Sequence, residues 1–415
     1  MKGRILLKNC AIRQSDGRVR TGMTVLLDEG RILRVSPVDQ IPTLPGDWEV
    51  TCRGRLVWPG RCDCHAHLMA GPLGKTWVKG RELEARLTVA EVESIGAFAM
   101  ARALRWGITT CVEHLFCPGA VHDGLLCEAR AAEALGLRLV ISHASSGALG
   151  ETSALAQLEA NADAISALKQ SRLIRAALGF DAPSSCGDQQ MRRLGELRLT
   201  LGVGIHFDLD PGRGGLGSGA RAPPGRRSEF GLDLGSAVGF AVDPEDAEEL
   251  VHSEATVVVS DLGPRTAAWL EQLQQDPVMF FRIGLGSGRA GRLPNPGPAG
   301  WEDGSGREAA LDRLLSGDPS FFFGELYGGP LGEVQEGYLA DLIVFDHVPC
   351  EDRIASSARY LIETLQSTPV AWTIVAGKVV VRENQLLGHD YLHLSSEAAK
   401  AVRAVRARAG LASEA

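Results

Sequence analysis

The chain has 415 residues, of which 45% are hydrophobic and 23% are charged, as is typical of a soluble globular protein. Its net charge of −8, together with the lack of a Lys/Arg-rich stripe in the sequence, argues against a nucleic-acid-binding surface. No run of about 18 apolar residues is present to span a membrane, and nine scattered cysteines behind a start without a signal segment predict reduced thiols and a cytoplasmic location.

The first 57 residues predict short β-strands. Apolar segments at 4–12, 24–28 and 31–36 have the length and composition of strands. Asp28-Glu29-Gly30 provides the turn between the second and the third. We therefore expect a small sheet at this end of the chain.

The central region changes to alternating helices and strands. Helical patterns such as 89–106 and 123–135 separate short apolar strands, the first of which lies within 56–63. Seven more strands are expected at 109–113, 138–142, 174–180, 203–208, 237–241, 256–260 and 281–285. Eight β/α units in succession predict an α/β fold, a (β/α)8 TIM-type barrel.

Strands return near the end of the chain, at 342–346, 370–375 and 378–381, and the last two form a hairpin around Ala376-Gly377. Strands at both ends of the chain predict one small β-sandwich domain built from both termini. The expected domains are residues 1–57 and 335–395 for the two halves of the sandwich, 58–334 for the barrel and 396–415 for a solvated C-terminal helix.

Two Gly/Pro-rich stretches, 211–224 and 288–306, follow the expected fifth and eighth strands. In a barrel these loops lie on the catalytic face, where lids and partner contacts occur. Their composition gives no prediction of their role.

The segment His65-Ala66-His67 is the strongest chemical signal. Histidines spaced i, i+2 on a strand share one face, so their imidazoles can converge on one cation. Zinc and iron sites commonly use such ligands. The structural alternative is a pair of histidines on a solvated strand edge.

Several other motifs accompany this pair. They are Trp58-Pro59-Gly60, Gly107-Ile108-Thr109-Thr110, Glu113-His114, Gly204-Ile205-His206, Gly284-Leu285-Gly286-Ser287, Gly337-Tyr338-Leu339-Ala340-Asp341-Leu342 and the tail hairpin. With them the chain resembles the amidohydrolase superfamily over nearly its whole length. The resemblance is to the cytosine-deaminase/chlorohydrolase branch and, within it, to the SsnA-type aminohydrolases.

The resemblance implies a metal site at the barrel mouth. His65 and His67 match the ligand pair of strand one, and His206 matches the histidine that ends strand five. Three imidazoles can hold one divalent zinc or iron ion with water in the open position. Such water becomes a hydroxide-like nucleophile near neutral pH.

Four other positions depart from the family pattern. Gly288 stands where the family has the Asp of strand eight, and Leu209 replaces a Glu that protonates the substrate. Val238 aligns with a water-polarising His, and Asp181 with a substrate-contacting His. General acid/base catalysis is worth about 100- to 10,000-fold in rate, so the family's mechanism does not run on this residue set.

Other residues are candidates to replace the missing groups. Strand periodicity puts Asp208 on the face of His206, and Asp181 ends another strand on the same rim, so either carboxylate is a candidate catalytic base. Glu113 and His114 are candidates for a supporting shell. The structural alternative for the acids is helix capping, and for His114 a hydrogen bond in the barrel mouth.

Cys62 and Cys64 bracket Asp63 beside the histidine pair. Thiolates bind zinc well, so a Cys-x-Cys-His-x-His metal cluster is conceivable. The strand pattern puts both cysteines on the face opposite the histidines, which favours packing.

Two functions follow from these observations. The first is a metal-dependent hydrolase of non-peptide C–N bonds, acting on a cyclic amidine or a purine/pyrimidine-like heterocycle with an altered proton-transfer set. The alternative is a catalytically silent amidohydrolase-fold subunit with a structural or regulatory role in a complex. In either case we expect no nucleic-acid or membrane partner, and a homodimer or a place in a larger assembly.

Overall fold

The structure is a computed structural model. It describes residues 3–13, 18–73, 77–181, 185–209, 238–241, 256–259, 266, 268–269, 282–285, 323–324, 326–346, 348 and 369–411. The two Gly/Pro-rich stretches and Gly288 lie outside these residues.

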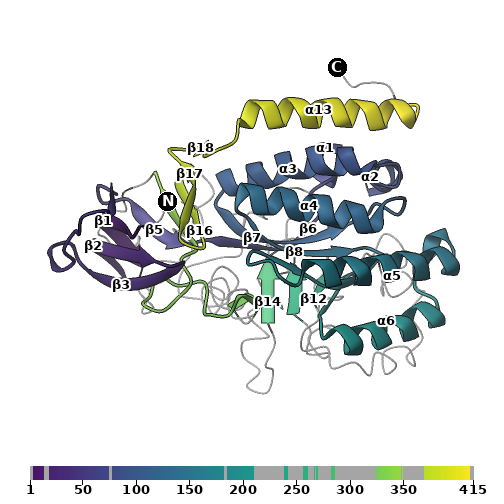
Figure 1. Cartoon of the computed structure of the whole chain (residues 1–415), viewed down its shortest axis with the longest axis horizontal. Coiled ribbons are helices and arrows are strands. Elements are labelled where there is room, and N and C mark those ends of the chain that lie inside the picture. The colour runs from purple at the N-terminus through teal and green to yellow at the C-terminus, as the bar shows by residue number, and fades with distance from the viewer. Residues whose placement is uncertain are drawn as a thin grey trace.

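Strands from both ends of the chain form one nine-stranded sheet, the terminal sheet (Figure 1). Its order is β18-β17-β16-β15-β5-β1-β2-β3, with β4 paired to β1. The strands are β1 Ile5–Arg13, β2 Val19–Asp28, β3 Arg31–Pro37, β4 Trp48–Thr51, β5 Leu56–Pro59, β15 Leu342–Phe345, β16 Val370–Val375, β17 Lys378–Arg382 and β18 Gln385–Leu386, with a 3-10 turn, η1, at Val38–Gln40. The described strands from both termini share one sheet, as predicted for a small domain built from both ends, and its arrangement as a sandwich stays a prediction.

The predicted strand at 56–63 is divided at Gly60. Its first part, β5, pairs with β15 in the terminal sheet, and its second part, β6 (Arg61–Ala66), pairs with β7 (Ile108–Leu115). A Cβ atom at Gly60 would lie 2.1 Å from Thr109 Oγ1, so the crossing requires glycine. The chain therefore changes sheets at this residue.

The remaining described strands are parallel and follow chain order. One sheet is β6-β7-β8-β9 and the other is β10-β11-β12-β13-β14. Their bounds are β8 Arg138–His143, β9 Ile174–Ala176, β10 Leu178–Phe180, β11 Ile205–Leu209, β12 Val238–Ala241, β13 Thr256–Val259 and β14 Arg282–Leu285.

All eight predicted α/β strands are present, and the fourth is divided into β9 and β10. The break falls at Ala177, whose N–H donates to Ile141 O at 2.9 Å. β14 lies against β6. In the described part of the chain, however, the ladders form two sheets, and no hydrogen-bonded ladder between β14 and β6 closes them into one barrel.

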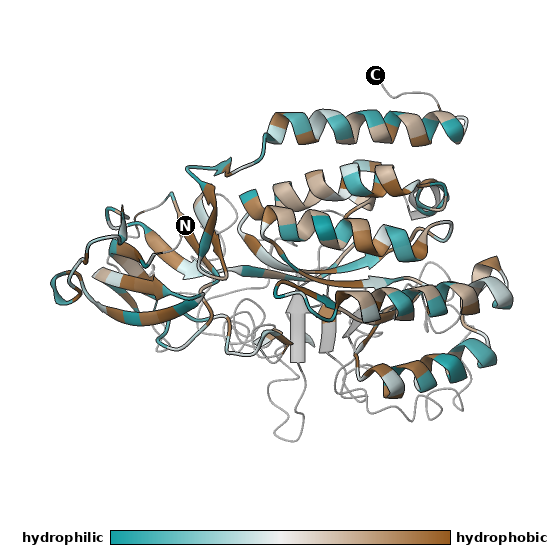
Figure 2. Ribbon diagram, viewed as in Figure 1, coloured by the Kyte–Doolittle hydropathy of each residue, from teal (hydrophilic) through white to brown (hydrophobic). Residues whose placement is uncertain are grey.

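The helices are α1 Ala70–Leu73, α2 Trp77–Glu84, α3 Val89–Arg105, α4 Val121–Leu135, α5 Glu151–Leu168, α6 Asp188–Leu201 and α13 Tyr391–Arg408, with the 3-10 turn η2 at Gly147–Leu149. Helices α3 to α6 lie along the outside of the parallel strands (Figure 1). Hydrophobic and hydrophilic residues alternate along α3 and α4 (Figure 2), and the buried positions Val92, Ile95 and Ala99 of α3 have helical spacing. No helix of the described ranges has the length and apolarity needed to cross a bilayer.

The C-terminal helix differs from the prediction. It begins at Tyr391, where the Asp390 side chain caps it by accepting from Leu392 N, and it ends at Arg408. It packs on α3 and buries Ala398, Ala401 and Val405. One face of this helix is therefore part of the core, which the expectation of a solvated surface helix did not include.

Candidate metal centre

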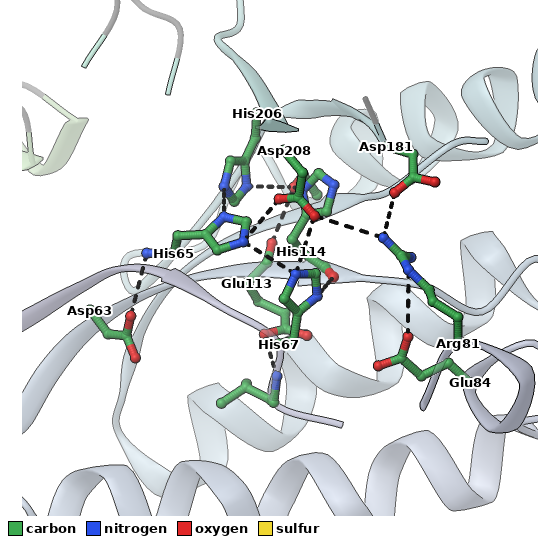
Figure 3. Close-up of polar contacts among 12 residues, drawn as sticks. Asp63, His65, His67, Arg81, Glu84, Glu113, His114, Asp181, His206 and Asp208 are labelled. Carbon is green, nitrogen blue, oxygen red and sulfur yellow. Dashed lines mark hydrogen bonds and ion pairs between the residues drawn. The ribbon is translucent and has the colours of Figure 1, made fainter. Parts of the chain in front are cut away.

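The histidines singled out in the sequence gather in one place, in or just after parallel strands (Figure 3). His65 lies in β6 and His67 just after it, His114 lies in β7 and His206 in β11, and all four are buried. Because parallel strands present their carboxyl ends to one rim, residues distant in the sequence meet there.

His65, His67 and Asp208 point their possible metal-binding atoms at one another. His65 Nε2 lies 3.0 Å from Asp208 Oδ1, His67 Nε2 lies 3.4 Å from Asp208 Oδ2, and the two Nε2 atoms are 3.2 Å apart. In the described part of the chain, His65, His67 and Asp208 are the group whose ligand atoms lie within 4.8 Å of one another.

His206 lies beside this group and contacts the other nitrogen of His65. Its Nε2 is 2.7 Å from His65 Nδ1, and its Nδ1 is 3.0 Å from Ser142 Oγ. The structure therefore brings the predicted trio His65, His67 and His206 together but adds Asp208 to the ligand group in place of His206. The ligand role of each residue stays a prediction.

The contacts fit the following tautomers of neutral imidazole rings, which are assigned from the hydrogen-bond partners. The Ser142 hydroxyl donates to Glu113 O at 3.1 Å, so it accepts from His206 Nδ1–H. His206 Nε2 then accepts from His65 Nδ1–H. His67 Nδ1 donates to His114 O at 2.9 Å. This Ser142–His206–His65 relay, together with the His67 contact, leaves the Nε2 atoms of His65 and His67 as acceptors.

The consequence is a buried site in which three acceptors, two imidazole nitrogens and a carboxylate, face one another. Acceptors at such distances repel unless a cation lies between them. Two imidazoles and a carboxylate are also a donor set that zinc and iron prefer. The residues present therefore fit a divalent metal ion.

The charge states agree with this assignment. Burial and the neighbouring His65 lower the pKa of His206 well below its ordinary value, so the ring is neutral and able to bind. Burial opposes ionisation of Asp208, but the adjacent histidines, His65 first, hold its pKa well below the usual range when they carry a proton and donate to it. Either those protons or a metal ion therefore supplies the positive charge that faces the Asp208 carboxylate.

The other predicted residues surround this group. Asp181 accepts from Arg81 Nη2 at 2.6 Å and from Ser146 Oγ at 3.1 Å, so both of its oxygens are engaged away from the imidazoles. Glu113 Oε2 accepts from Leu68 N at 2.8 Å, which fixes the backbone that follows His67.

His114 supports the site through its backbone and its ring. Its carbonyl holds His67, and its Nδ1 lies 3.3 Å from Ser142 Oγ. Burial and the neighbouring His206 lower the pKa of His114 well below its ordinary value, so its ring is neutral.

The cysteines beside the histidine pair are not in the ligand group of the described residues. Cys64 packs with Val112 and Val140 in an apolar cluster, and burial raises the pKa of Cys62 to about 12. These contacts agree with the packing role predicted for both.

The structure describes some of the positions that depart from the family pattern. Leu209 ends β11, and Val238 begins β12 opposite His206 in the strand ladder, as expected for a sixth strand.

Sequence reasoning missed two polar residues of the site, Arg81 and Ser142. Arg81 lies in α2 and reaches Asp181 across 100 residues of sequence. Ser142, at the end of β8, lies between His206 and His114. The only available signal was the position of Ser142 at the carboxyl end of a predicted strand.

Comparison with curated proteins gives partial matches, and no protein-family model matches the chain. The chain is 31% identical over 208 residues to a 5-methylthioadenosine/S-adenosylhomocysteine deaminase of Symbiobacterium thermophilum, covering 46% of the chain and 44% of that protein. It is 28% identical over 228 residues to a protein of the same name from Moorella thermoacetica, covering 51% and 50%. The aligned segments thus span about half the length of these relatives.

Solved structures match the whole chain in fold. A triazine hydrolase variant superposes with a TM-score of 0.71 at 15% identity, covering 96% of this chain and 99% of the other. A zinc-bound adenosine deaminase from Xanthomonas campestris gives 0.69 at 15%, covering 97% and 98%. An amidohydrolase from a Sargasso Sea sample gives 0.65 at 17%, covering 98% and 100%.

These likenesses concern the fold, which the chain shares with the solved triazine hydrolase, adenosine deaminase and amidohydrolase structures. That fold agrees with the resemblance to amidohydrolases inferred from the sequence motifs. Both curated relatives described above carry the name of a deaminase.

Proposed function

We propose that this protein is a metal-dependent hydrolase of non-peptide C–N bonds, acting on a cyclic amidine or a purine/pyrimidine-like heterocycle. The observation that carries the proposal is the set of three buried acceptors, His65 Nε2, His67 Nε2 and the Asp208 carboxylate, that face one another at 3.0–3.4 Å. The partial matches to deaminases and the shared fold support the same reaction class.

His65, His67 and Asp208 would hold the ion, zinc or iron, and His206 stands next to them as the third imidazole expected from the family. When bound, such an ion supplies Lewis-acid activation of a water molecule. The residues of the chain orient the metal-binding side chains and exclude bulk water. The relay from Ser142 through His206 fixes the ring of His65, and burial keeps bulk water away from the donor atoms.

Proton transfer is assigned to Asp208. Its oxygens face the imidazoles, whereas those of Asp181 are held by Arg81 and Ser146. Of the two candidates, Asp208 is therefore the carboxylate placed to accept a proton beside the ligand group. Asp181 then serves to position Arg81 and Ser146, which donate to it.

The architecture is part of the proposal. We infer that the eight parallel strands close as a (β/α)8 barrel, residues 58–334. Residues 1–57 and 335–395 would form the sandwich-like domain, and 396–415 the terminal helical segment. Homodimerisation and a cytoplasmic location remain predictions.

The test is metal analysis followed by a substrate screen. Purified protein measured by inductively coupled plasma mass spectrometry is expected to contain about one zinc or iron per chain. His65→Ala and Asp208→Asn should each remove it, whereas the exposed control His122→Ala should retain it. Ammonia release from a panel of aminated heterocycles should disappear in the same two variants.

A wild-type metal content below about a tenth of an equivalent would contradict the proposal. The catalytically silent subunit would then be the better description. Ammonia release that survives Asp208→Asn would instead place the reaction elsewhere in the molecule.

A further inference from the structure

Arg81 is a buried cation that lies between Asp181 and Asp208 of the candidate metal centre, and its Nε is 3.9 Å from a third buried acid, Glu84 Oε2 (Figure 3). Its Nη2 lies 2.6 Å from Asp181 Oδ1 and 3.8 Å from Asp208 Oδ2. Its guanidinium also stacks over the Phe116 ring, 4.3 Å from the centroid. Phe116 therefore restricts where the charged group of Arg81 can lie.

Asp181 is fixed by contacts of its own. Ser146 Oγ donates to its second oxygen at 3.1 Å, and its backbone O accepts from Asp208 N at 2.8 Å. Asp181 is thus tied both to Arg81 and to the strand that carries Asp208.

Without the guanidinium, Asp181 and Asp208 would be two buried carboxylates on one rim. Like charges repel, so the two carboxylates would turn away from each other. With Arg81 between them, Asp181 has a counter-ion at 2.6 Å. The Asp208 oxygens lie toward His65 and His67.

We propose that Arg81 is a positioning residue of the metal centre, which neutralises Asp181 and so holds the Asp208 carboxylate facing His65 and His67. This inference rests on the proposed function, because it assumes that the three acceptors bind a metal ion. It assigns to α2, which follows β6 and α1 in the chain, a role in setting metal affinity.

The charge of Arg81 and its positioning effect change metal affinity in opposite directions. A cation near the centre repels a divalent ion, so if charge alone mattered, removal of Arg81 would tighten metal binding. If positioning dominates, removal weakens binding about 10- to 100-fold, as for other residues that orient metal ligands. The sign of the change separates the two effects.

The experiment is a titration of metal-free protein with Co(II) alone, following the visible absorption of the bound ion. Arg81→Met should weaken binding and alter the spectrum. Arg81→Lys should restore part of the affinity, because it keeps the charge without the planar fork. Arg175→Met, which removes a guanidinium that packs on Tyr327, is the matched control and should bind as wild type does.

Asp181→Asn tests the route of the effect. If Arg81 acts through Asp181, the double variant should lose less affinity than the sum of the two single losses. Thermal unfolding of each variant checks folding. Should Arg81→Met not fold, the Lys and Asn variants provide the same comparison.

If the Arg81→Met variant binds Co(II) with the affinity and spectrum of the wild type, or more tightly, the inference is overturned and the proposed function stays intact. A wild-type protein that binds no Co(II) would overturn the proposed function and, with it, this role of Arg81.

Discussion

At the level of single residues, the hydroxyl of Ser142 ends the hydrogen-bond relay that begins at His65. Because it accepts from His206 Nδ1–H, it determines which nitrogen of each ring carries a proton. We predict that Ser142→Ala weakens metal binding about 10- to 100-fold with little change in the unfolding midpoint. Competition with a chromophoric chelator measures the affinity, and Ser166→Ala, on the remote helix α5, is the control. An unchanged affinity would show that the relay does not orient His65.

Glu128 is a second residue whose role can be measured, through the pH dependence of stability. It is fully buried in α4, and burial raises its pKa to about 8. In the unfolded chain it titrates near 4.5. The folded state therefore binds the extra proton, and the stability this contributes is present at low pH and is lost as the pH rises through about 8.

We accordingly predict that the free energy of unfolding falls between pH 5 and pH 8, and that Glu128→Gln, which cannot ionise, makes this fall shallower. Urea unfolding across that pH range measures both. The exposed Glu93→Gln on α3 should keep the wild-type slope. A Glu128→Gln variant with the same slope as wild type would contradict the assignment.

At this scale the sequence predicted much of the site. The i, i+2 spacing placed His65 and His67 together, and strand periodicity put Asp208 on the face of His206. Two contacts depend on tertiary packing, which no local pattern encodes. Asp208 faces His65 across 143 residues of sequence, and Arg81 contacts Asp181 across 100. Which nitrogen of His206 meets which partner is likewise a property of the assembled rim.

At the level of secondary-structure elements, α13 shows why an Ala/Arg-rich helix was predicted to be solvated. Its buried face consists mainly of small side chains, Ala398 and Ala401, with Val405 fully enclosed, so its hydrophobic periodicity is weak. Arg408 also reaches Glu91 of α3, with Nη1 at 2.7 Å from Oε1. The apolar stripe is narrow, but it fits closely against α3.

We predict that Val405→Ala lowers the free energy of unfolding by about 2 kcal/mol, because it leaves a cavity between α13 and α3. The exposed Arg403→Ala on the same helix should change it by less than about 0.5 kcal/mol. Urea denaturation followed by circular dichroism measures both. Equal, small effects would show that α13 does not contribute to the core.

At the level of the whole molecule, chain order correctly predicted the succession of parallel strands and the union of both termini. The pattern of alternating apolar residues does not say where one sheet ends and another begins. The division at Gly60 and the single terminal sheet follow from contacts such as Gly60 N to Asp341 O, 2.8 Å, between segments far apart in sequence.

The junction between the terminal sheet and the parallel strands centres on a buried ion pair. Arg138, at the start of β8, donates from Nε and Nη2 to the two oxygens of Asp341, each at 2.9 Å, and its guanidinium lies over Tyr327. Asp341 precedes β15 of the terminal sheet. Removing one partner leaves the other as an uncompensated buried charge, which costs about 3–5 kcal/mol.

We therefore predict that Arg138→Ala destabilises the protein by about that amount and that both parts of the molecule unfold together at a lower temperature. The exposed pair of Arg193 and Glu196 is the control, and Arg193→Ala should cost less than about 1 kcal/mol. Calorimetry distinguishes the outcomes. One shifted transition means that other contacts keep the two parts coupled and that the ion pair contributes stability to both, whereas two separate transitions would mean that the ion pair is what couples them. An unchanged melting temperature would show that Asp341 finds another partner.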